Sequence, residues 1–410
     1  MSTTTPQPTS SPLRSFPTSG FEVLDPSVPV EEETLPTYSA EKYYPVHIGE
    51  VLGDRYQVVA KIGFGVTSTV WLGRDISTSQ YAVLKVYVTG RERNHEIEVY
   101  ERIEATQTDH LGKSCIRKLL GHFSIDGPHG RHVCLVHEPL GLSLYEYLFF
   151  LPGRIMEFES MKACLRQVIA TLDWLHTEAG VIHTDLQLKN LLLPGSPTYL
   201  SRAETVEMNS PTPRKVLDDG RRTIHTSQIV VPGNGLPLLS DMGECRFVST
   251  EKQFDEIMPN AYRAPEVILH MGWDEKVDIW NVAMLAWDIV SSRCLFQGWN
   301  ADDIFADRVH VAEMVALLGP PPRDFVERSK VGHVFWDENN TWKDLAPIPD
   351  ITLESLGAKF KEEERDKQGF YRFLRKALQW KPEDRPTARE LINDEWLLEG
   401  LGIPKRDEVQ

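Results

Sequence analysis

Cysteine is scarce in this sequence and lacks the spacing that would build a structural framework from it. Five cysteines are scattered over 410 residues, their number is odd, and no CxxC pair occurs. Disulfide-rich domains and zinc modules both depend on closely spaced cysteines, so the sequence argues against both. We expect the protein to work in a reducing compartment.

A long hydrophobic run is also missing. The first twenty residues are rich in Ser, Thr and Pro, and the most apolar later stretch, 279–290, is interrupted by Asn281 and Asp288. A membrane-spanning helix needs about 20 consecutive, mostly apolar residues. We therefore expect neither a signal peptide nor a membrane span.

The sequence contains fewer basic than acidic residues. The chain carries 44 Lys and Arg against 60 Asp and Glu, for a formal net charge of −16. Nucleic-acid binders present basic surfaces, so we expect no direct contact with nucleic acid. Basic protein partners would suit this charge, although acidic side chains on solvated faces explain it as well.

The first part of the chain divides into a tail and a small lobe. Residues 1–40 are rich in Ser, Thr and Pro, which predicts a disordered tail because they bury too little apolar surface to offset ordering entropy. Residues 41–141 contain short β-type runs, such as YQVVAKIG and YAVLKVYV, and one helical pattern at 92–105. These patterns predict a β-rich lobe with one main helix.

The second part of the chain is helical in pattern. Residues 142–400 predict a larger α-rich lobe, in which Gly180 suits a helix C-cap. A stretch at about 194–237, with repeated Ser, Thr, Pro and Gly, predicts an inserted and mostly disordered loop. Residues 401–410 are left as a C-terminal tail.

A glycine-rich turn separates two of the predicted strands. Gly63, Gly65 and Ser68 lie between YQVVAKIG and STVWLGRD. Glycine lets a backbone approach a phosphate closely and offer its N–H groups to it. Taken alone, an ordinary β-turn explains Gly-x-Gly at least as well, and the Walker pattern is absent.

Lys85 lies in a strand that is otherwise apolar. It follows the Ala-Val-Leu stretch at 82–84, where a lysine needs an anionic partner. A bound phosphate would supply one, and Glu96 on the following helix would orient the ammonium group through an ion pair. The structural alternative is an edge lysine that reaches solvent.

The most specific motif is His-Thr-Asp-Leu-Gln-Leu-Lys-Asn at 183–190. It resembles the catalytic loop of protein kinases, whose aspartate orients the substrate hydroxyl and whose asparagine holds a magnesium ion. Ser-Asp-Met-Gly at 240–243 stands where that family has Asp-Phe-Gly, and Tyr-Arg-Ala-Pro-Glu at 262–266 resembles the end of its activation segment. The order of these motifs identifies the chain as a member of the protein kinase family, which implies an α+β fold of two lobes.

The resemblance implies a role for each matched residue. Asp185 would orient the acceptor hydroxyl, Lys85 would hold the α- and β-phosphates of ATP, and Asn190 and Asp241 would hold Mg²⁺. Because Pro139 has no N–H, Leu140 is the expected hinge donor to adenine. The residues expected to bind the nucleotide are Ile62, Gly63, Gly65, Ser68, Val70, Ala82, Lys85, Glu96, Glu138 and Leu140, and His137 falls at the gatekeeper position.

Two further matches are structural. Asp278, in Asp-Ile-Trp, resembles the residue of the kinase helix that ties down the catalytic loop. Arg385, in the stretch 380–386, resembles the partner of Glu266.

Within the kinases, the sequence most resembles the SR-protein kinases, the SRPK family of the CMGC group, which phosphorylate Arg-Ser repeats of splicing factors. The resemblance rests on Ser68 at the third glycine position, on Thr184, on the closure at 262–266, and on the stretch 310–319 followed by prolines. The insert at 194–237 is similar to the spacer of that family but shorter. This resemblance covers about residues 40–400 and implies a serine/threonine protein kinase acting on basic, Arg-Ser-rich proteins.

Three positions depart from common kinase patterns. Gln187 stands where serine/threonine kinases carry a lysine that neutralises the transferring phosphate, and we expect Lys189 to supply this charge instead. Thr184 replaces the arginine that clasps a phosphorylated activation loop, so we expect activity without phosphorylation at Ser249 or Thr250. The acidic docking groove of the SR-protein kinases is only partly matched, because Asp307 is followed by Arg-Val at 308–309.

Two other function classes stay open from the sequence. A catalytically weak ATP-binding pseudokinase scaffold is the main alternative, because Gln187 removes the usual charge. A small-molecule kinase of the same fold is disfavoured by the peptide-supporting segment 261–266. Family resemblance implies a monomer that occurs in the cytoplasm and the nucleus.

Overall fold

The structure is a computed structural model that describes residues 12–90, 94–217 and 222–401. The chain divides into two compact units, each with its own core. The first comprises Met1–His95, Arg117–Leu142 and Leu192–Gly235, and the second comprises Glu96–Ile116, Ser143–Leu191 and Leu236–Gln410.

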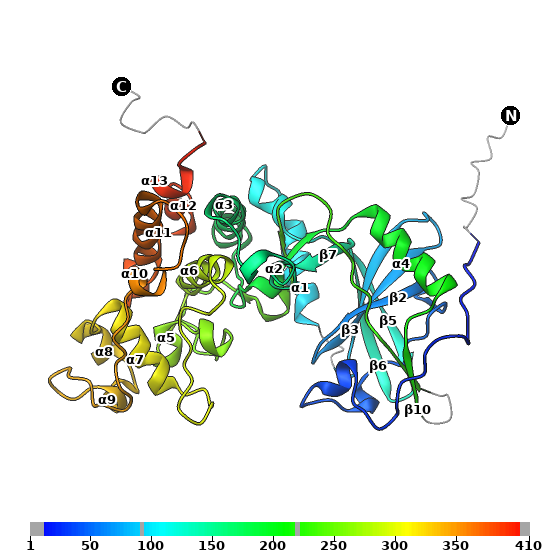
Figure 1. The fold of residues 1–410 in the computed structure, drawn as a ribbon, viewed down its shortest axis with the longest axis horizontal. Helices are drawn as coiled ribbons and strands as arrows, with labels where there is room; N and C mark the ends of the chain where they lie inside the picture. The colour runs from blue at the N-terminus through cyan, green and yellow to red at the C-terminus, as the bar shows by residue number, and fades with distance from the viewer. Residues whose placement is uncertain (1–11, 91–93, 218–221, 402–410) are drawn as a thin grey trace. The chain divides into compact units, whose positions relative to one another are not determined.

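The first unit is built on a six-stranded antiparallel sheet with the strand order β1-β2-β3-β4-β6-β5 (Figure 1). Its β-branched and aromatic residues favour strands, and Gly or polar residues mark each turn, as the sequence predicts. The strands are β1 (Val51–Leu52), β2 (Tyr56–Phe64), β3 (Ser68–Asp75), β4 (Tyr81–Tyr87), β5 (Leu119–Gly127) and β6 (Gly130–His137), and β7 (Leu140–Ser143) and β9 (Leu191–Pro194) follow later in the chain.

The inserted segment is not the mostly disordered loop that we expected. It forms helix α4 (Pro197–Asn209), which lies beside β2, and an antiparallel hairpin of β10 (Arg214–Leu217) and β11 (Arg222–His225) (Figure 1). Leu200 and Ala203, one helical turn apart, pack with Ala60 and Leu72 of the sheet. This apolar pair offsets the cost of ordering the segment, and we overlooked it among the Ser, Thr and Pro residues.

The N-terminal segment is also ordered in its described part, from residue 12 onward, so disorder there was the wrong expectation. It contains two short 3-10 helices, η1 (Glu31–Thr34) and η2 (Ala40–Lys42), and Val23 forms a parallel bridge with Arg214 of the insert. Residues 1–11 of the predicted tail, and all but the first residue of the predicted C-terminal tail, lie outside the described residues.

The acidic run at 31–33 explains this order. Lys61 of β2 is buried and pairs with Glu32 and, at 3.3 Å, with Glu31. Lys215 of the insert pairs with Glu33 at 2.8 Å. The run therefore joins the N-terminal segment to the sheet and the insert, since buried charges need partners.

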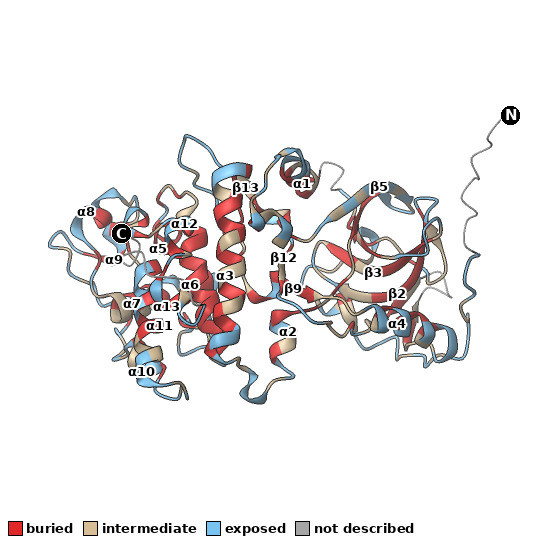
Figure 2. Cartoon of the chain, turned by 90° about the horizontal axis from the view of Figure 1, so that it is seen from above, coloured by how far each residue is buried: buried red, intermediate tan, exposed pale blue. Residues whose placement is uncertain are grey.

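The second unit is mainly helical. At its centre, every residue of α6 (Lys276–Val290) from Val277 to Val290 is buried (Figure 2). The other α-helices are α1 (His95–Ala105), α2 (Leu144–Leu148), α3 (Phe158–Trp174), α5 (Pro265–Ile268), α7 (Asp307–Leu318), α8 (Arg323–Arg328), α9 (Gly332–Phe335), α10 (Leu353–Leu356), α11 (Glu364–Ala377), α12 (Ala388–Leu391) and α13 (Glu395–Leu398).

Short elements complete this unit. The π-helical turn η5 (Leu175–Ala179) extends α3 and ends at Gly180, whose left-handed backbone (φ 66°) confirms the predicted C-cap. The remaining elements are η3 (Leu111–Cys115), η4 (Pro152–Arg154), η6 (Leu188–Asn190), η8 (Met242–Glu244), η9 (Asn260–Tyr262), η10 (Pro382–Asp384), β8 (Val181–Ile182), β12 (Leu238–Leu239) and β13 (Arg246–Phe247).

A small β-rich unit and a larger α-rich unit confirm the predicted α+β class. Helix α1, which we expected with the small lobe, groups with the second unit from Glu96 onward. Across the described ranges, no helix combines the length and apolar character needed to cross a bilayer.

Replacing Lys61 with methionine should destabilise the protein by about 3 kcal/mol, because two carboxylates would lose their buried partner. The exposed pair Arg323–Glu327 offers a control, and Arg323→Ala should leave stability unchanged. Equilibrium urea denaturation measures both. A Lys61→Met protein as stable as the control would contradict the role given to this ion pair.

Candidate active site

The glycine-rich turn joins β2 and β3 as a tight hairpin. The N–H of Gly65 donates to the carbonyl of Ser68 at 2.8 Å, and the hydroxyl of Tyr43 lies 3.1 Å from the Gly65 carbonyl. Val70 pairs with Gly63 on one side and with Lys85 on the other. Three adjacent strands thus place the turn, an apolar side chain and a cation next to one another, as a phosphate site requires.

Ala82 lies on the wrong face of β4 for its predicted role. Side chains alternate along a strand, so Val83 shares the face of Lys85 and Ala82 shares the face of Leu84. Ala82 is 2% exposed and packs in the core with Leu84 and Trp71. The expected adenine contact at Ala82 does not fit this packing, and Val83 lies on the face of Lys85 instead. The sequence alone could have indicated Val83, because residues two positions apart on a strand share a face.

The predicted hinge residues lie at the end of β6 and the start of β7. The backbone of Glu138 is already engaged: its N–H donates to Lys118 at 3.2 Å, and its carbonyl accepts from Arg117 at 3.2 Å. Leu140 is buried at the start of β7. Burial lowers the pKa of the gatekeeper His137 well below its usual value, with help from the charges of Arg117 and Lys85, so this ring is neutral.

Other predicted nucleotide residues differ in their surroundings. Ile62 is partly buried and packs against the cluster that contains Leu200 of the insert. The ammonium group of Lys85 lies 5.1 Å from the centre of the Tyr87 ring. Glu96 is buried in α1 of the second unit, so its pairing with Lys85 of the first unit stays a prediction.

In the second unit, Asp278 of α6 anchors the catalytic loop, as predicted. Its two carboxylate oxygens accept the backbone N–H groups of His183 at 2.8 Å and Thr184 at 2.9 Å. The ring of His176 lies 2.8 Å from the same carboxylate. Burial favours protonation, but the hydrogen bond and charge of His176 and these backbone donors hold the pKa of Asp278 below its usual value.

Two amide side chains orient Asp185. Gln187 donates to Asp185 Oδ1 at 2.8 Å, and Asn190 donates to Asp185 Oδ2 at 2.7 Å. Burial raises the pKa of Asp185, and the charge of Asp241 adds to this, although His183 and both amides oppose it. The carboxylate is thus held in one orientation with two neutral donors, and Gln187 acquires a positioning role that the sequence did not reveal.

Asn190 and Asp241 offer the oxygen donors that magnesium prefers. The amide nitrogen of Asn190 binds Asp185, so its Oδ1 is the atom that would ligate a metal ion. Ser240, next to Asp241, donates its backbone N–H to the carbonyl of Asn190 at 2.8 Å, which joins the two segments. Asp241 has a left-handed backbone (φ 60°), a conformation that aspartate adopts more readily than most non-glycine residues. The residues present therefore fit a magnesium site.

Lys189 and Thr184 flank this arrangement. Lys189 is exposed, and its ammonium group lies 5.3 Å from the centre of the Tyr145 ring. The hydroxyl of Thr184 donates to the backbone carbonyl of Glu244 at 2.5 Å. Thr184 thus ties the catalytic loop to the start of the activation segment without any phosphate.

The predicted pair of Arg385 and Glu266 is confirmed. Two parallel hydrogen bonds of 2.7 Å join the guanidinium group to the carboxylate, and both side chains are buried. The end of the activation segment is thereby fixed to the body of the second unit.

Comparisons with known proteins agree with this geometry. The protein kinase domain model matches residues 56–397, so the chain belongs to the protein kinase family. A serine/threonine protein kinase of Aspergillus fumigatus is 39% identical over 95% of this chain and 96% of its own length. The serine/threonine-protein kinase SRPK of Physarum polycephalum is 28% identical over 90% of this chain and 91% of its own length.

More distant relatives extend the same pattern. Human SRSF protein kinase 3 is 23% identical over 90% of each chain. A solved kinase domain covers 87% of this chain and 99% of its own, with a TM-score of 0.67 and 24% identity, and shows the same fold. The protein is a serine/threonine protein kinase with SRPK relatives, which confirms the resemblance, and a kinase domain implies the use of ATP and a divalent metal ion.

Replacing Gln187 with leucine should move the acid limb of the pH–rate profile to higher pH. Asp185 works unprotonated, and losing a donor to its charged form raises its pKa further, by up to about one unit. Gln368→Leu makes the same chemical change on α11, where the amide binds only Glu364 at 2.8 Å, and serves as the control. If both profiles match the wild type, Gln187 does not tune Asp185.

Proposed function

We propose that this kinase transfers the γ-phosphate of Mg²⁺-bound ATP to serines in basic, Arg-Ser-rich proteins of the splicing-factor type. The observation that carries the chemistry is the constellation around Asp185, held by Gln187, Asn190 and the anchored loop. The substrate class rests on the similarity to the SR-protein kinases, on relatives that bear SRPK and SRSF protein kinase names, and on the net charge of −16. Such a charge attracts basic segments over long range.

The proposed nucleotide site draws on residues of the small unit. The turn from Gly63 to Ser68 would cover the phosphates, although the N–H of Gly65 is engaged by the Ser68 carbonyl, and Lys85 would hold the α- and β-phosphates. Val70 and Val83 would contact the adenine, together with Ile62, and Glu138 and Leu140 would meet its polar edge. Glu96 would orient Lys85.

The second unit would supply the chemistry. Asp185 would accept and orient the proton of the serine hydroxyl, and Asn190 and Asp241 would hold the metal ion that neutralises the phosphates. Lys189, four positions after Asp185, would stabilise charge on the transferring group in place of the lysine that Gln187 replaces. Lys85, Asp185, Asn190 and Asp241 are all retained, which favours catalysis over an inactive scaffold.

Substrate docking through the acidic groove of the SR-protein kinases is weakened here. Asp307, its retained acidic position, lies 3.9 Å from Arg263, which offsets its charge. We therefore expect basic segments to be recognised in part by other surfaces. From the resemblance to the SR-protein kinases, we propose work in the cytoplasm and nucleus, in mRNA splicing, as a monomer.

The test is phosphate transfer from ATP to an Arg-Ser repeat peptide and to an unrelated basic peptide. Wild type should label the Arg-Ser peptide preferentially, Asp185→Ala should lower kcat at least about 100-fold, and Lys189→Ala at least about tenfold. Equal labelling of both peptides would reject the substrate class, and Mg²⁺-ATP binding without transfer would favour the pseudokinase scaffold.

Activity should not require phosphorylation of the activation segment, because Thr184 binds Glu244 directly. A Ser249→Ala/Thr250→Ala protein made without phosphate should retain kcat within about twofold of wild type. Thr184→Val removes the hydroxyl at nearly constant volume and should lower kcat, whereas Thr198→Val, an exposed site on α4, should not. Strict dependence on either phosphorylated residue would overturn this expectation.

A further inference from the structure

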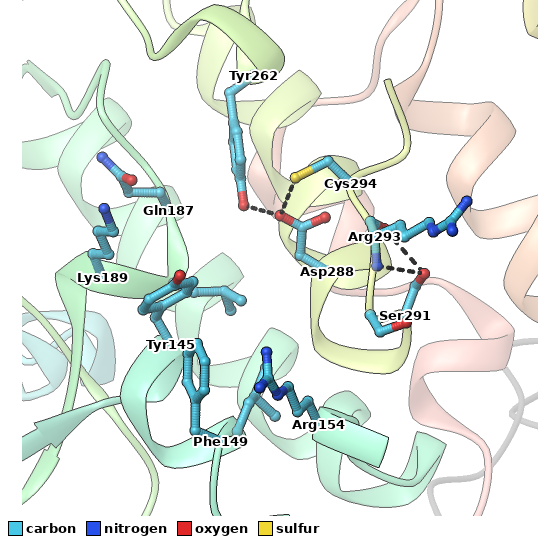
Figure 3. A pocket seen from close by; sticks show the side chains of 13 residues that line it. Tyr145, Phe149, Arg154, Gln187, Lys189, Tyr262, Asp288, Ser291, Arg293 and Cys294 are labelled. Atoms are coloured by element: carbon cyan, nitrogen blue, oxygen red, sulfur yellow. Dashed lines mark hydrogen bonds between the residues drawn. The ribbon is translucent and has the colours of Figure 1, made fainter. Parts of the chain in front are cut away.

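A cavity of about 240 Å³ opens in the second unit beside the catalytic loop (Figure 3). Its walls come from α2 and η4, from residues 187–189 of the catalytic loop, from Tyr262, and from the end of α6 with residues 291–294. The catalytic loop contributes directly, because the Gln187 amide that lines the cavity also donates to Asp185. Any group bound here would therefore lie near the serine presented to Asp185.

Aromatic rings form much of the wall. Tyr145 and Phe149, on the same side of the cavity, meet edge to face with ring centres 5.2 Å apart (Figure 3). Each also contacts a cation: the guanidinium carbon of Arg154 lies 4.4 Å from the Phe149 ring centre, and Lys189 lies over Tyr145. These contacts hold two positive groups at the cavity rather than in bulk solvent.

The charge balance of the lining is positive. Arg154, Lys189 and Arg293 line the cavity, all three are exposed, and none forms an ion pair with any residue in the described ranges. In Figure 3, the side chain of Arg293 extends outward, Arg154 lies beside Phe149, and Lys189 lies beside Gln187 on the other side of Tyr145. Asp288 is the single carboxylate among the described lining residues.

Asp288 forms no ion pair with these three cations in the described part of the chain. Its Oδ2 accepts hydrogen bonds from the hydroxyl of Tyr262 and, at 3.6 Å, from the thiol of Cys294 (Figure 3). Its Oδ1 is buried and has no hydrogen-bond partner among the described residues. Burial raises the pKa of Asp288 to about 6, although the hydrogen bonds from Tyr262 and Cys294 oppose this, so protonating the carboxyl group costs less free energy than protonating an exposed one. A protonated Oδ1 would donate a hydrogen bond rather than accept one.

We propose that this cavity binds the phosphate of a phosphoserine that the substrate already carries near the serine to be modified. The proposal rests on the proposed function and narrows its substrate class, because such a substrate joins arginines with at least one phosphorylated serine. Arg154 would form charge-assisted hydrogen bonds with the phosphate oxygens, and Lys189 and Arg293 would add positive charge at the edges of the cavity. A substrate arginine fits less well, since three cations line the cavity and would repel it, and the one carboxylate is buried.

The test uses one Arg-Ser peptide with a single target serine. Each position within five residues of the target is varied in turn and carries serine, phosphoserine or arginine. Wild type should show a kcat/KM about tenfold higher for phosphoserine at one or two positions. Arg154→Gln/Arg293→Gln should abolish this preference and leave kcat/KM for the unphosphorylated peptide unchanged. Arg372→Gln, an exposed arginine of α11 outside the cavity, is the matched control and should keep the preference.

A binding measurement separates this proposal from the proposed function. Fluorescence anisotropy with a phosphopeptide whose target serine is alanine needs no catalysis, and the double variant should weaken its binding about tenfold. Equal affinity for phosphorylated and unphosphorylated peptides would overturn the cavity assignment even if the protein labels Arg-Ser peptides well. A preference for arginine would assign the cavity to a guanidinium group instead and also overturn the proposal. Failure to label Arg-Ser peptides, with phosphopeptide binding intact, would count against the proposed function alone.

Discussion

The carboxylate of Asp278 holds the catalytic loop in place. It is completely buried at the centre of the second unit, and it accepts two consecutive backbone N–H groups and a histidine ring. A buried charge is tolerated only when hydrogen bonds replace the water that it loses, and here the replacement donors belong to the loop itself. The position of Asp185, one residue further on, therefore depends on a carboxylate of helix α6.

The first unit uses buried charge for a different purpose. Lys61 is buried in the sheet and pairs with Glu31 and Glu32, which lie 30 and 29 positions earlier. Helix α4 of the insert covers part of the same sheet with apolar side chains. The N-terminal segment and the insert thus both pack on the first unit. We expect the sheet that carries Lys85 to depend on them for its stability.

Part of the site could be predicted from the sequence because kinase chemistry requires particular residues at fixed spacings. The loop at 183–190, Asp241, Asp278 and the pairing of Arg385 with Glu266 followed from motif order alone, and the structure bears out the two anchoring interactions. Ala82 was misassigned although the alternation of β4 was visible in the sequence. From the sequence, Gln187 was interpreted only as the loss of the usual lysine charge. Its hydrogen bond to Asp185 could be found only from the structure.

The sequence by itself determined the family, the two-lobed α+β class and the identity of the chemical groups, because these depend on local pattern and on residue type. Tertiary structure alone decided whether the N-terminal segment and the insert are ordered, since the partners of Glu31, Glu33 and Leu200 are distant along the chain. It also decided where charge accumulates. Arg154, Lys189 and Arg293 are separated in sequence by up to 139 positions, and only folding brings them to the wall of one cavity.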